Sequence, residues 1–438
     1  MKRDPLALSG REHDVLVVGG GIAGAWTAYE AASRGLRTAL IELEDFGQAT
    51  SWSSLKTAHG GLRHLQRLDV AGFRESVAER RALLRVAPVV VRPLAFAIAA
   101  PSKLDRAKFF LGGVANDVLS FDRNEGVGPD RLLGTSQILD RPAAELLGAG
   151  PLDSSHVFTW QDAQITHTER LLMGVLHAAV EADAVILNHG RIDRSTRTAA
   201  GFAVKVADLI GGGEIAFSTR SVVNAAGAKL EAVARLFGAT CEGPPLIRGV
   251  NVVLGRDLSP QVALGAKDQG RFLFLVPWMG RSILGTIYDD GARPVNDLVS
   301  ELFVAGRRAF PWADIREDDV QVVHSGHVPR AANGEAIYRS RLIPGGEAPL
   351  ISIMSAKYTT ARATAQKAVE EIGRQLSIRL RPSVSATTLL PLAAPLRGSL
   401  SERLRIAEAS EMAASPAEAW RGRLPEGADG TPFSDGSH

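Results

Sequence analysis

Residues 14–42 constrain the fold of this chain more than any other segment, and they read DVLVVGGGIAGAWTAYEAASRGLRTALIE. The apolar run at 15–18 predicts a buried strand, and it leads into three glycines at G-x-G-x-x-G spacing: Gly19, Gly21 and Gly24. A helical stretch of small residues follows at 22–34, and a second apolar run at 38–41 ends beside Glu42. A strand, a glycine turn, a helix, a second strand and an acid in this order predict the opening βαβ unit of a doubly wound parallel sheet.

Each part of this segment has a physical role in binding a dinucleotide. Gly19 permits the tight turn, Gly21 lets the backbone approach a pyrophosphate, and Gly24 lets the helix pack closely on the strand. The positive end of the helix dipole and unpaired N–H groups face the phosphates from the first helical residues, Ile22 and Ala23. Glu42 follows at the interval expected for an acid that accepts hydrogen bonds from ribose hydroxyls.

The composition is that of an ordinary globular protein. Its 438 residues, 45% of them hydrophobic and 22% charged, are enough for two or more domains. A net charge of +2, without zinc-finger, RRM or helix-turn-helix patterns, predicts no nucleic-acid partner. The single cysteine, Cys241, leaves no internal disulfide or cysteine metal cluster and suits a reducing compartment.

No membrane-spanning helix is predicted. The first 13 residues are too polar for a signal peptide. The longest apolar stretch, at 86–101, is interrupted by Pro88, Arg92 and Pro93 and falls short of the roughly 20 apolar residues that a span needs. We therefore expect a cytoplasmic protein, with attachment to the inner membrane face left open.

Periodicity outlines the rest of the chain. Helical spacing at 72–86 predicts a helix whose charged residues form a solvated face, and residues 101–150 read as an insertion with short helices. A helix is expected at 168–182 before a strand at 184–188, and alternating segments at 202–208 and 214–219 read as further strands. Alternation at 250–254, 271–277 and 281–287 predicts antiparallel strands of a second domain.

The string FGQATSWSSLKTAHGGLRHLQ, at 46–66, follows directly after Glu42. Together with the first 45 residues it resembles the FAD-dependent glycerol-3-phosphate dehydrogenases of the DAO-type flavoprotein superfamily, whose signature runs close to TS-x-x-S-S-K-x-x-HGGLRYL. The resemblance continues in family order at VVNAAG (222–227), PWMGRSILGTIYD (277–289) and MSAKYTTARATAQ (354–366). One departure is His64, which stands where the family carries a tyrosine.

The resemblance implies an α/β fold: a Rossmann-like FAD-binding domain of the glutathione-reductase/DAO type and an α+β substrate domain with an antiparallel sheet. We expect the FAD-binding domain to be discontinuous, over 1–90, 151–235 and 328–395. The substrate or cap domain is expected over 91–150 and 236–327. Residues 396–438 are expected to form a short C-terminal helix and a disordered tail.

Four places along the chain are expected to contact the FAD beyond the glycine turn. The Thr/Ser-rich turn supplies hydroxyl and N–H donors for the pyrophosphate, although a helix cap or polar turn would use the same residues: Thr50, Ser51 and Ser54. His59, Gly60 and Gly61 let the backbone approach the flat isoalloxazine. Ala226 and Gly227 form a late turn, with an ordinary loop glycine as the alternative. Lys357, Tyr358 and Thr359 open a helix aimed at the flavin pyrimidine edge.

The resemblance also implies which residues face the substrate. Lys357 and Arg339 are placed at the substrate phosphate, with Arg63 as a third cation, because guanidinium groups bind phosphate well. The family reads S-G-V-R-P where this chain reads Ser325-Gly326-His327-Val328-Pro329, so Val328 takes the place of the family arginine. His327 and Arg330 are candidates to replace it. Alternation along a strand favours Arg330, which would share a face with Val328.

His59 and His64 are the other candidate acid–base residues, since histidine titrates near neutral pH. A partly exposed helix position is the alternative interpretation of His64. The remaining histidines show no paired spacing for a metal, and we predict no metal site. Asp162 and Glu169 are interpreted as capping and interdomain contacts.

Three functions remain open from the sequence. The first is an FAD-dependent dehydrogenase that oxidises a secondary alcohol, glycerol 3-phosphate or a related phosphorylated polyol, by hydride transfer to flavin N5 and passes electrons to quinone or another acceptor. The second is an FAD-dependent oxidase of an amine, amino acid or 2-hydroxy acid that releases peroxide, and the third is a non-catalytic FAD-binding subunit. The expected substrate is a small anionic molecule. Membrane contact through 72–86 or 104–119 and homo-oligomer formation are left open.

Overall fold

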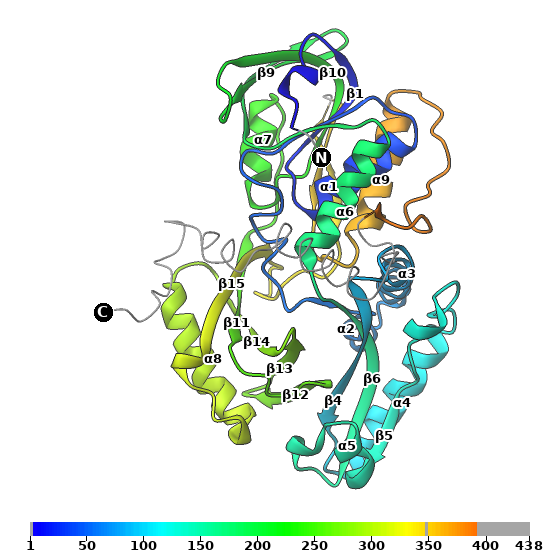
Figure 1. Cartoon of the computed structure of the whole chain (residues 1–438), viewed down its shortest axis with the longest axis vertical. Helices are drawn as coiled ribbons and strands as arrows, with labels where there is room; N and C mark the ends of the chain where they lie inside the picture. The colour runs from blue at the N-terminus through cyan, green and yellow to red at the C-terminus, as the bar shows by residue number, and fades with distance from the viewer. Residues whose placement is uncertain (1–2, 347–348, 392–438) are drawn as a thin grey trace, which may run out of the picture.

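Two β-sheets organise the molecule, one above the other in Figure 1. The structure is a computed structural model, and it describes residues 3–346 and 349–391. The predicted C-terminal helix and tail at 396–438 lie outside the described residues. In this view the upper part contains the glycine turn and the lower part contains the antiparallel strands of the second half of the chain.

The upper sheet has eight strands, with β16-β17-β10-β1-β2-β7 in order and β9 and β8 added beyond β10. The strands β1, β2, β7, β10 and β17 pair in parallel, while β8, β9 and β16 pair antiparallel. The bounds are β1 Glu12–Val18, β2 Thr38–Ile41, β7 Val185–Leu187, β8 Gly190–Thr198, β9 Gly201–Asp208, β10 Glu214–Asn224, β16 Arg341–Pro344 and β17 Leu350–Met354.

Both faces of this sheet are covered, which explains why its central strands are continuous apolar runs. Val15, Val17 and Leu40 face one layer, in which α1 (Ile22–Ser33) packs against α6 (Thr168–Glu181) and α9 (Ala361–Gln375). Leu16 and Val18 alternate to the other side, where residues of β9 and of α7 (Leu230–Leu236) pack. The predicted βαβ unit is therefore confirmed.

The lower sheet has nine strands, in the order β15-β11-β14-β13-β12-β4-β6-β3 with β5 beside β6. All its pairings are antiparallel except that between β4 and β12. The bounds are β3 Thr57–Ala58, β4 Val91–Ala99, β5 Gln137–Asp140, β6 His156–Ile165, β11 Leu246–Leu254, β12 Val262–Asp268, β13 Arg271–Trp278, β14 Arg281–Asp289 and β15 Val320–Pro329.

The two faces of the lower sheet are packed differently. Helix α8 (Val295–Ala309) covers one face with Leu298, Leu302 and Phe303. The other face is rich in aromatic side chains, and its rings include Phe96 stacked on Trp160 with centroids 5.2 Å apart. His59 lies against this face, with its ring 5.6 Å from that of Phe96. The aromatic face thus forms one boundary of the region around the His59–Gly61 segment.

Three sequence expectations about local structure need correction. Within the predicted insertion at 101–150, α4 (Lys103–Leu119) is a 17-residue helix, because Ser102 caps its N-terminus and apolar residues recur along it. The expected FAD-binding segment 151–235 includes β6, which pairs within the lower sheet.

Three further α-helices have the bounds α2 Leu62–Gln66, α3 Val70–Val86 and α5 Arg141–Leu146.

The third correction concerns α3, whose charged residues were expected to form a solvated face. Glu79 and Arg80 are only 3% and 2% exposed. Glu79 pairs with Arg362 at the start of α9, and Arg80 pairs with Asp162 on β6. Burying such charges requires close partners, and α3 therefore connects α9 to the lower sheet.

Candidate active site

The glycine turn is packed so closely that side chains are excluded from it. Gly19 has φ +105°, and a Cβ there would lie 2.7 Å from the carbonyl oxygen of Ala225. A Cβ on Gly24 would lie 1.8 Å from the carbonyl oxygen of Gly19. The first position needs glycine for its conformation, and the second needs it for the contact of α1 with the turn.

The first turn of α1 has the donors and acceptors that a dinucleotide requires. Gly21 precedes the helix without a side-chain cap, and a Cβ on it would lie 3.0 Å from Ser51 Oγ. Ser51 Oγ accepts a hydrogen bond from the N–H of Ile22 at 2.9 Å. Glu42 accepts from the N–H groups of Gly20 and Glu44 at 2.5 and 2.9 Å. N–H groups and a hydroxyl beside a carboxylate fit the diphosphate and ribose of FAD.

Thr50 and the late turn lie on either side of this region. Thr50 Oγ1 accepts from the N–H of His327 at 3.1 Å and donates to its carbonyl at 3.2 Å, so this hydroxyl holds β15. Ser54 Oγ accepts from the N–H of Lys56 at 3.1 Å. The turn at Ala226 and Gly227 follows the carbonyl of Ala225, which touches Gly19. The glycine turn and the late turn therefore lie next to each other.

A buried carboxylate orients the His59–Gly61 segment. Asp162 Oδ1 accepts from the N–H of Gly60 at 2.6 Å, and Asp162 Oδ2 lies 3.3 Å from Nδ1 of His59. Burial raises the pKa of Asp162, but the charge of Arg80 and the hydrogen bonds from His59 and Gly60 outweigh it and hold the pKa at about 2. Asp162 is on β6 and not at a helix start, so the expected capping role is wrong. No local spacing in the sequence marks this role, because Gly60 and Asp162 are 102 residues apart.

The N-terminus of α9 has capacity for a ligand. Thr360 precedes the helix, and its Oγ1 is buried without a hydrogen-bond partner among the described residues. Glu79 accepts from the N–H of Ala363 at 3.1 Å. The hydroxyl of Tyr358 donates to the carbonyl of Thr168 at 2.7 Å, while Thr359 is buried. An orphaned hydroxyl at a helix N-terminus fits the polar edge of a flavin, and the role expected of residues 357–359 stays a prediction.

Three cations surround the ring of Tyr338, a residue that the sequence analysis did not single out. The guanidinium carbons of Arg63 and Arg67 lie 5.4 and 5.2 Å from the ring centroid, and Lys357 Nζ lies 5.4 Å from it. Arg63 also donates to the Tyr338 hydroxyl, and Arg67 pairs with Glu335. Arg63 is exposed and has no carboxylate partner among the described residues. This cluster is positioned to bind an anion.

His64 connects this cluster to a carboxylate. Its Nε2 lies 2.9 Å from Lys357 Nζ, and its Nδ1 lies 2.9 Å from Oδ2 of Asp69. Asp69 Oδ1 is 3.4 Å from Arg339. Burial, and after it the charge of Lys357, lower the pKa of His64, while burial lowers the pKa of Lys357 to about 8. His64 is 4% exposed, so the alternative interpretation as a partly exposed helix residue is wrong.

The substitutes proposed for the missing family arginine lie on or beside β15. Val328 pairs with Ile247 of β11, and His327 is half-buried with its backbone bound to Thr50. Arg330 donates its N–H to the carbonyl of Pro245 at 2.7 Å and forms a bridge with Ala336, two residues before Tyr338. The structure thus brings together His64, Arg63, Arg339 and Lys357, whereas the side chain of His327 forms no hydrogen bond or ion pair with them among the described residues.

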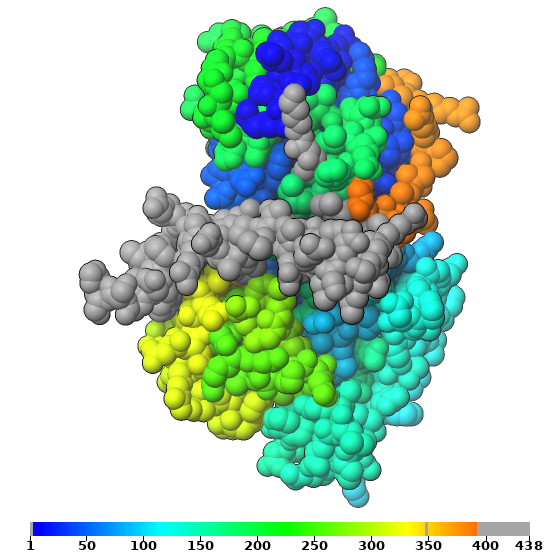
Figure 2. Space-filling view, in the orientation of Figure 1, coloured from blue at the N-terminus to red at the C-terminus, as the bar shows by residue number. Residues whose placement is uncertain are grey.

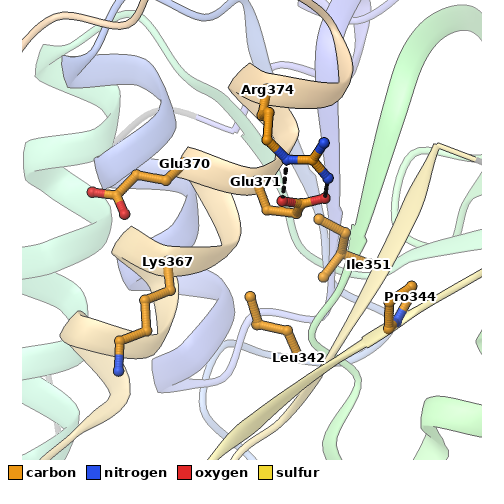
Figure 3. A pocket seen from close by; sticks show the side chains of 7 residues that line it. All are labelled: Leu342, Pro344, Ile351, Lys367, Glu370, Glu371 and Arg374. Atoms are coloured by element: carbon orange, nitrogen blue, oxygen red, sulfur yellow. Dashed lines mark hydrogen bonds and ion pairs between the residues drawn. The ribbon is translucent and has the colours of Figure 1, made fainter.

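No group of three or more His, Cys, Asp or Glu side chains suits a metal ion in the described part of the chain. A pocket also lies between β16, β17 and the later turns of α9, and Figure 3 shows Glu371 paired with Arg374 at its wall. Lys367, on the same wall, pairs with Glu75. These charged side chains of the pocket therefore already form ion pairs. The pocket lies beside α9, beyond the N-terminal turn that carries Thr360.

The fold and the site define a flavoprotein with a Rossmann-like FAD-binding sheet and a second, largely antiparallel sheet. The chain belongs to the DAO family of FAD dependent oxidoreductases, whose match covers residues 14–367. It is an FAD-dependent oxidoreductase related to glycerol-3-phosphate dehydrogenases, as the sequence motifs predict.

Three known proteins illustrate the relationship. A probable mitochondrial glycerol-3-phosphate dehydrogenase of Caenorhabditis elegans is 30% identical over 394 residues, covering 83% of this chain and 53% of that protein. The glycerol-3-phosphate dehydrogenase of Bacillus halodurans, solved with FAD, has a TM-score of 0.65 at 22% identity over 94% of this chain and 75% of its own. L-alpha-glycerophosphate oxidase of Mycoplasma pneumoniae, also solved with FAD, has a TM-score of 0.64 at 17% identity, and the match covers 87% of this chain and 99% of that protein. The chain spans about half the length of the nematode relative.

Proposed function

We propose that this protein oxidises a secondary alcohol that carries an anionic group, and that its substrate is glycerol 3-phosphate or a related phosphorylated polyol. The observation that carries the proposal is the cation cluster around Tyr338, with Arg63, Lys357 and the neighbouring Arg339. A phosphate binds well to guanidinium groups, which stay charged at all physiological pH values. The related glycerol-3-phosphate dehydrogenases make a phosphorylated polyol the first substrate to test.

The residues of the chain would divide the work. FAD, when bound, accepts the hydride from the alcohol carbon. Arg63 and Arg339 would hold the anionic group and thereby fix the orientation of the carbon atom. A base must take the hydroxyl proton. The candidates are Lys357 and His64, which lie 2.9 Å apart, and His59, which lies 3.3 Å from Asp162. We also propose that electrons leave the flavin to quinone or another acceptor.

Anaerobic bleaching of the purified yellow protein tests this function. Glycerol 3-phosphate should reduce the flavin, whereas glycerol, which lacks the anion, should do so far more slowly. A panel of amines, amino acids and 2-hydroxy acids serves as the comparison, with peroxide measured after air is admitted. Bleaching by any of these with none by polyol phosphates would replace the proposal with an oxidase function. Retained FAD without bleaching by any of these compounds would indicate a binding subunit.

The oxidase alternative has one specific observation in its favour. Val328, on β15, stands where the resemblance places an arginine, so one substrate contact of the family is missing. A valine cannot donate a hydrogen bond to a hydroxyl or a phosphate. The peroxide measurement separates the two functions, because an oxidase returns its electrons to oxygen.

We further propose that α4 contacts the inner membrane face. Its exposed apolar residues include Leu104, Phe110 and Leu111, and the helix lies at the outer edge of the lower part of the molecule (Figure 2). Phe109 instead stacks on Phe158, with centroids 5.3 Å apart. No helix in the described ranges is long and apolar enough to cross a bilayer. Flotation with anionic vesicles should be lost in F110D/L111D and retained in V304D, a similar change on α8.

A further inference from the structure

Asp69, His64 and Lys357 form a line of three side chains from three different elements. Asp69 caps α3, His64 is on α2, and Lys357 lies in the segment before α9. The two contacts in the line are both 2.9 Å. His64 is almost fully buried at the centre, so the hydrogen bonds of its two ring nitrogens are set by the protein.

The acceptor at one end fixes the direction of these hydrogen bonds. The N–H of Gly72 and the side chain of His64 lower the pKa of Asp69, so its carboxylate is ionised and can only accept. The proton of a neutral His64 therefore lies on Nδ1, facing Asp69. Its Nε2 then has a free lone pair, which accepts from the amino group of Lys357.

We propose that His64 and Asp69 are positioning residues that orient the amino group of Lys357 and favour its protonated form, so that Lys357 Nζ is the acceptor of the substrate hydroxyl proton. This assignment rests on the proposed function. It gives His64 a role that the tyrosine of the family signature cannot fill, because a phenol hydroxyl does not offer the imidazole pair of a donor and an acceptor on opposite sides.

Lysine suits this role where the neighbouring arginines do not. Arg63 and Arg339 remain charged and can bind an anion, but they cannot take up a proton at neutral pH. Burial lowers the pKa of Lys357 to about 8, so a useful fraction of the amino group is neutral near that pH. The charged or titratable groups that face Lys357 or His64 are Asp69, Arg339, Asp162, Arg63, Glu75 and Tyr338.

The reaction balances with these groups. FAD, when bound, would accept the hydride, with its two electrons, that leaves when the C–H bond of the alcohol breaks. The O–H bond breaks, and its proton binds the lone pair of Lys357 Nζ while the carbon–oxygen bond becomes a carbonyl. The resulting ammonium group donates to His64 Nε2, and Asp69 balances the added charge through the imidazole.

The first test measures the pKa of Lys357 in the FAD-loaded protein without substrate, by pH-dependent competitive labelling of lysines and mass spectrometry. H64F fills the site but removes the acceptor, and it should lower the pKa of Lys357 by about one unit, since a hydrogen bond to a charged group is lost. H64Q keeps a hydrogen-bond acceptor and should lower the pKa of Lys357 by less than half as much as H64F does. H177Q, at a histidine on α6 that lies 3.8 Å from Glu181, is the matched control and should not move it.

A second variant protects the test against a loss of folding in H64F. D69N keeps the helix cap, because asparagine caps as well as aspartate, but removes the charge at the end of the line. It should also lower the pKa of Lys357. An unchanged Lys357 pKa in both H64F and D69N overturns the proposal.

The rate of flavin reduction gives the complementary measurement. The substrate is the one that bleaches the flavin in the anaerobic test described under the proposed function. In wild type, the rate of flavin reduction by this substrate should fall at pH values below the pKa of Lys357. In D69N the pH at which the rate falls should shift together with that pKa. A fall in rate that stays at the same pH while the labelled pKa moves also overturns the proposal. Labelling needs no turnover, so a wrong substrate class and a wrong role for His64 give different results.

Discussion

Asp162 Oδ1 accepts a hydrogen bond from the backbone N–H of Gly60 at 2.6 Å, and this contact fixes the glycine pair Gly60 and Gly61 to strand β6. The same carboxylate pairs with Arg80, which α3 presents from the other side. Since both charged groups are buried, each depends on the other for its solvation. The His59–Gly61 segment is thus held by a carboxylate that belongs to an ion pair.

The substitution D162N should destabilise the protein by about 3–5 kcal/mol, because the asparagine still accepts from Gly60 but leaves Arg80 as an unpaired buried charge. Urea unfolding measures the change. D193N is the control, since Asp193 pairs with Arg191 at an exposed position on β8. Equal stability of D162N and wild type would mean that the buried pair contributes nothing.

The same pair predicts a pH dependence of stability. The pKa of Asp162 lies at about 2 in the folded protein and at 3.8 in the reference state, so the folded form binds its proton less readily. The stabilisation is fully present above about pH 4 and is lost as the pH falls towards 2. Unfolding at a series of acid pH values should show a steeper loss in wild type than in D162N.

The glycine turn gives a prediction about cofactor binding. G24A places a Cβ within 1.8 Å of the carbonyl of Gly19, and backbone cannot yield as a side chain can, so α1 must move away from the turn. FAD affinity, measured by flavin fluorescence, should fall by at least tenfold. The control is G112A, in the interior of α4 with nothing within 4 Å of the added methyl, which should leave FAD affinity unchanged. Wild-type affinity in G24A would contradict the assignment of this turn to the cofactor.

Sequence periodicity and spacing predicted the βαβ unit and a dinucleotide site because their causes are local, whereas the FAD family followed from the resemblance of the ordered motifs. Gly19 and Gly24 are required by contacts within one strand–turn–helix unit, which appear in the sequence as fixed intervals. The strands of the second sheet alternate because one face packs on α8, and this pattern also is local.

Contacts made across the fold were not visible in the sequence. Tyr338, which the sequence analysis did not single out, lies 275 residues from Arg63. Asp162 was assigned to capping and interdomain contacts, and Gly60, which donates to it, lies 102 residues away. Asp69 is only five residues from His64, but its other partner, Arg339, comes from the far end of the chain. Glu79 and Arg80 were expected to be exposed to solvent because the sequence of a helix does not show which distant residues pack against it. Only the packing of α3 between α9 and β6 reveals that these charges are buried.

The cation cluster predicts how the substrate binds. R63M should raise the Kd for glycerol 3-phosphate by roughly 10–100-fold, because the variant loses a charge-assisted contact to the anion while it keeps a side chain of similar length. The Kd is measured from the dependence of anaerobic flavin reduction on substrate concentration. R191M, which removes an exposed arginine on β8, is the control. An unchanged Kd in R63M would exclude this arginine from the anion site.

The pH dependence of flavin reduction follows from the low pKa of Lys357. The group ordinarily titrates at 10.5, and burial lowers its pKa to about 8, so the ammonium form predominates below pH 8 and cannot accept a proton. The rate of reduction should therefore fall about tenfold per pH unit below pH 8 and level off above it. Stopped-flow reduction of the anaerobic protein between pH 6 and 9.5 measures this profile. K357R stays charged throughout that range, so its residual rate of flavin reduction should not change near pH 8. A wild-type rate that is constant across pH 8 would assign the proton to another group. So would a K357R variant whose rate still falls below pH 8.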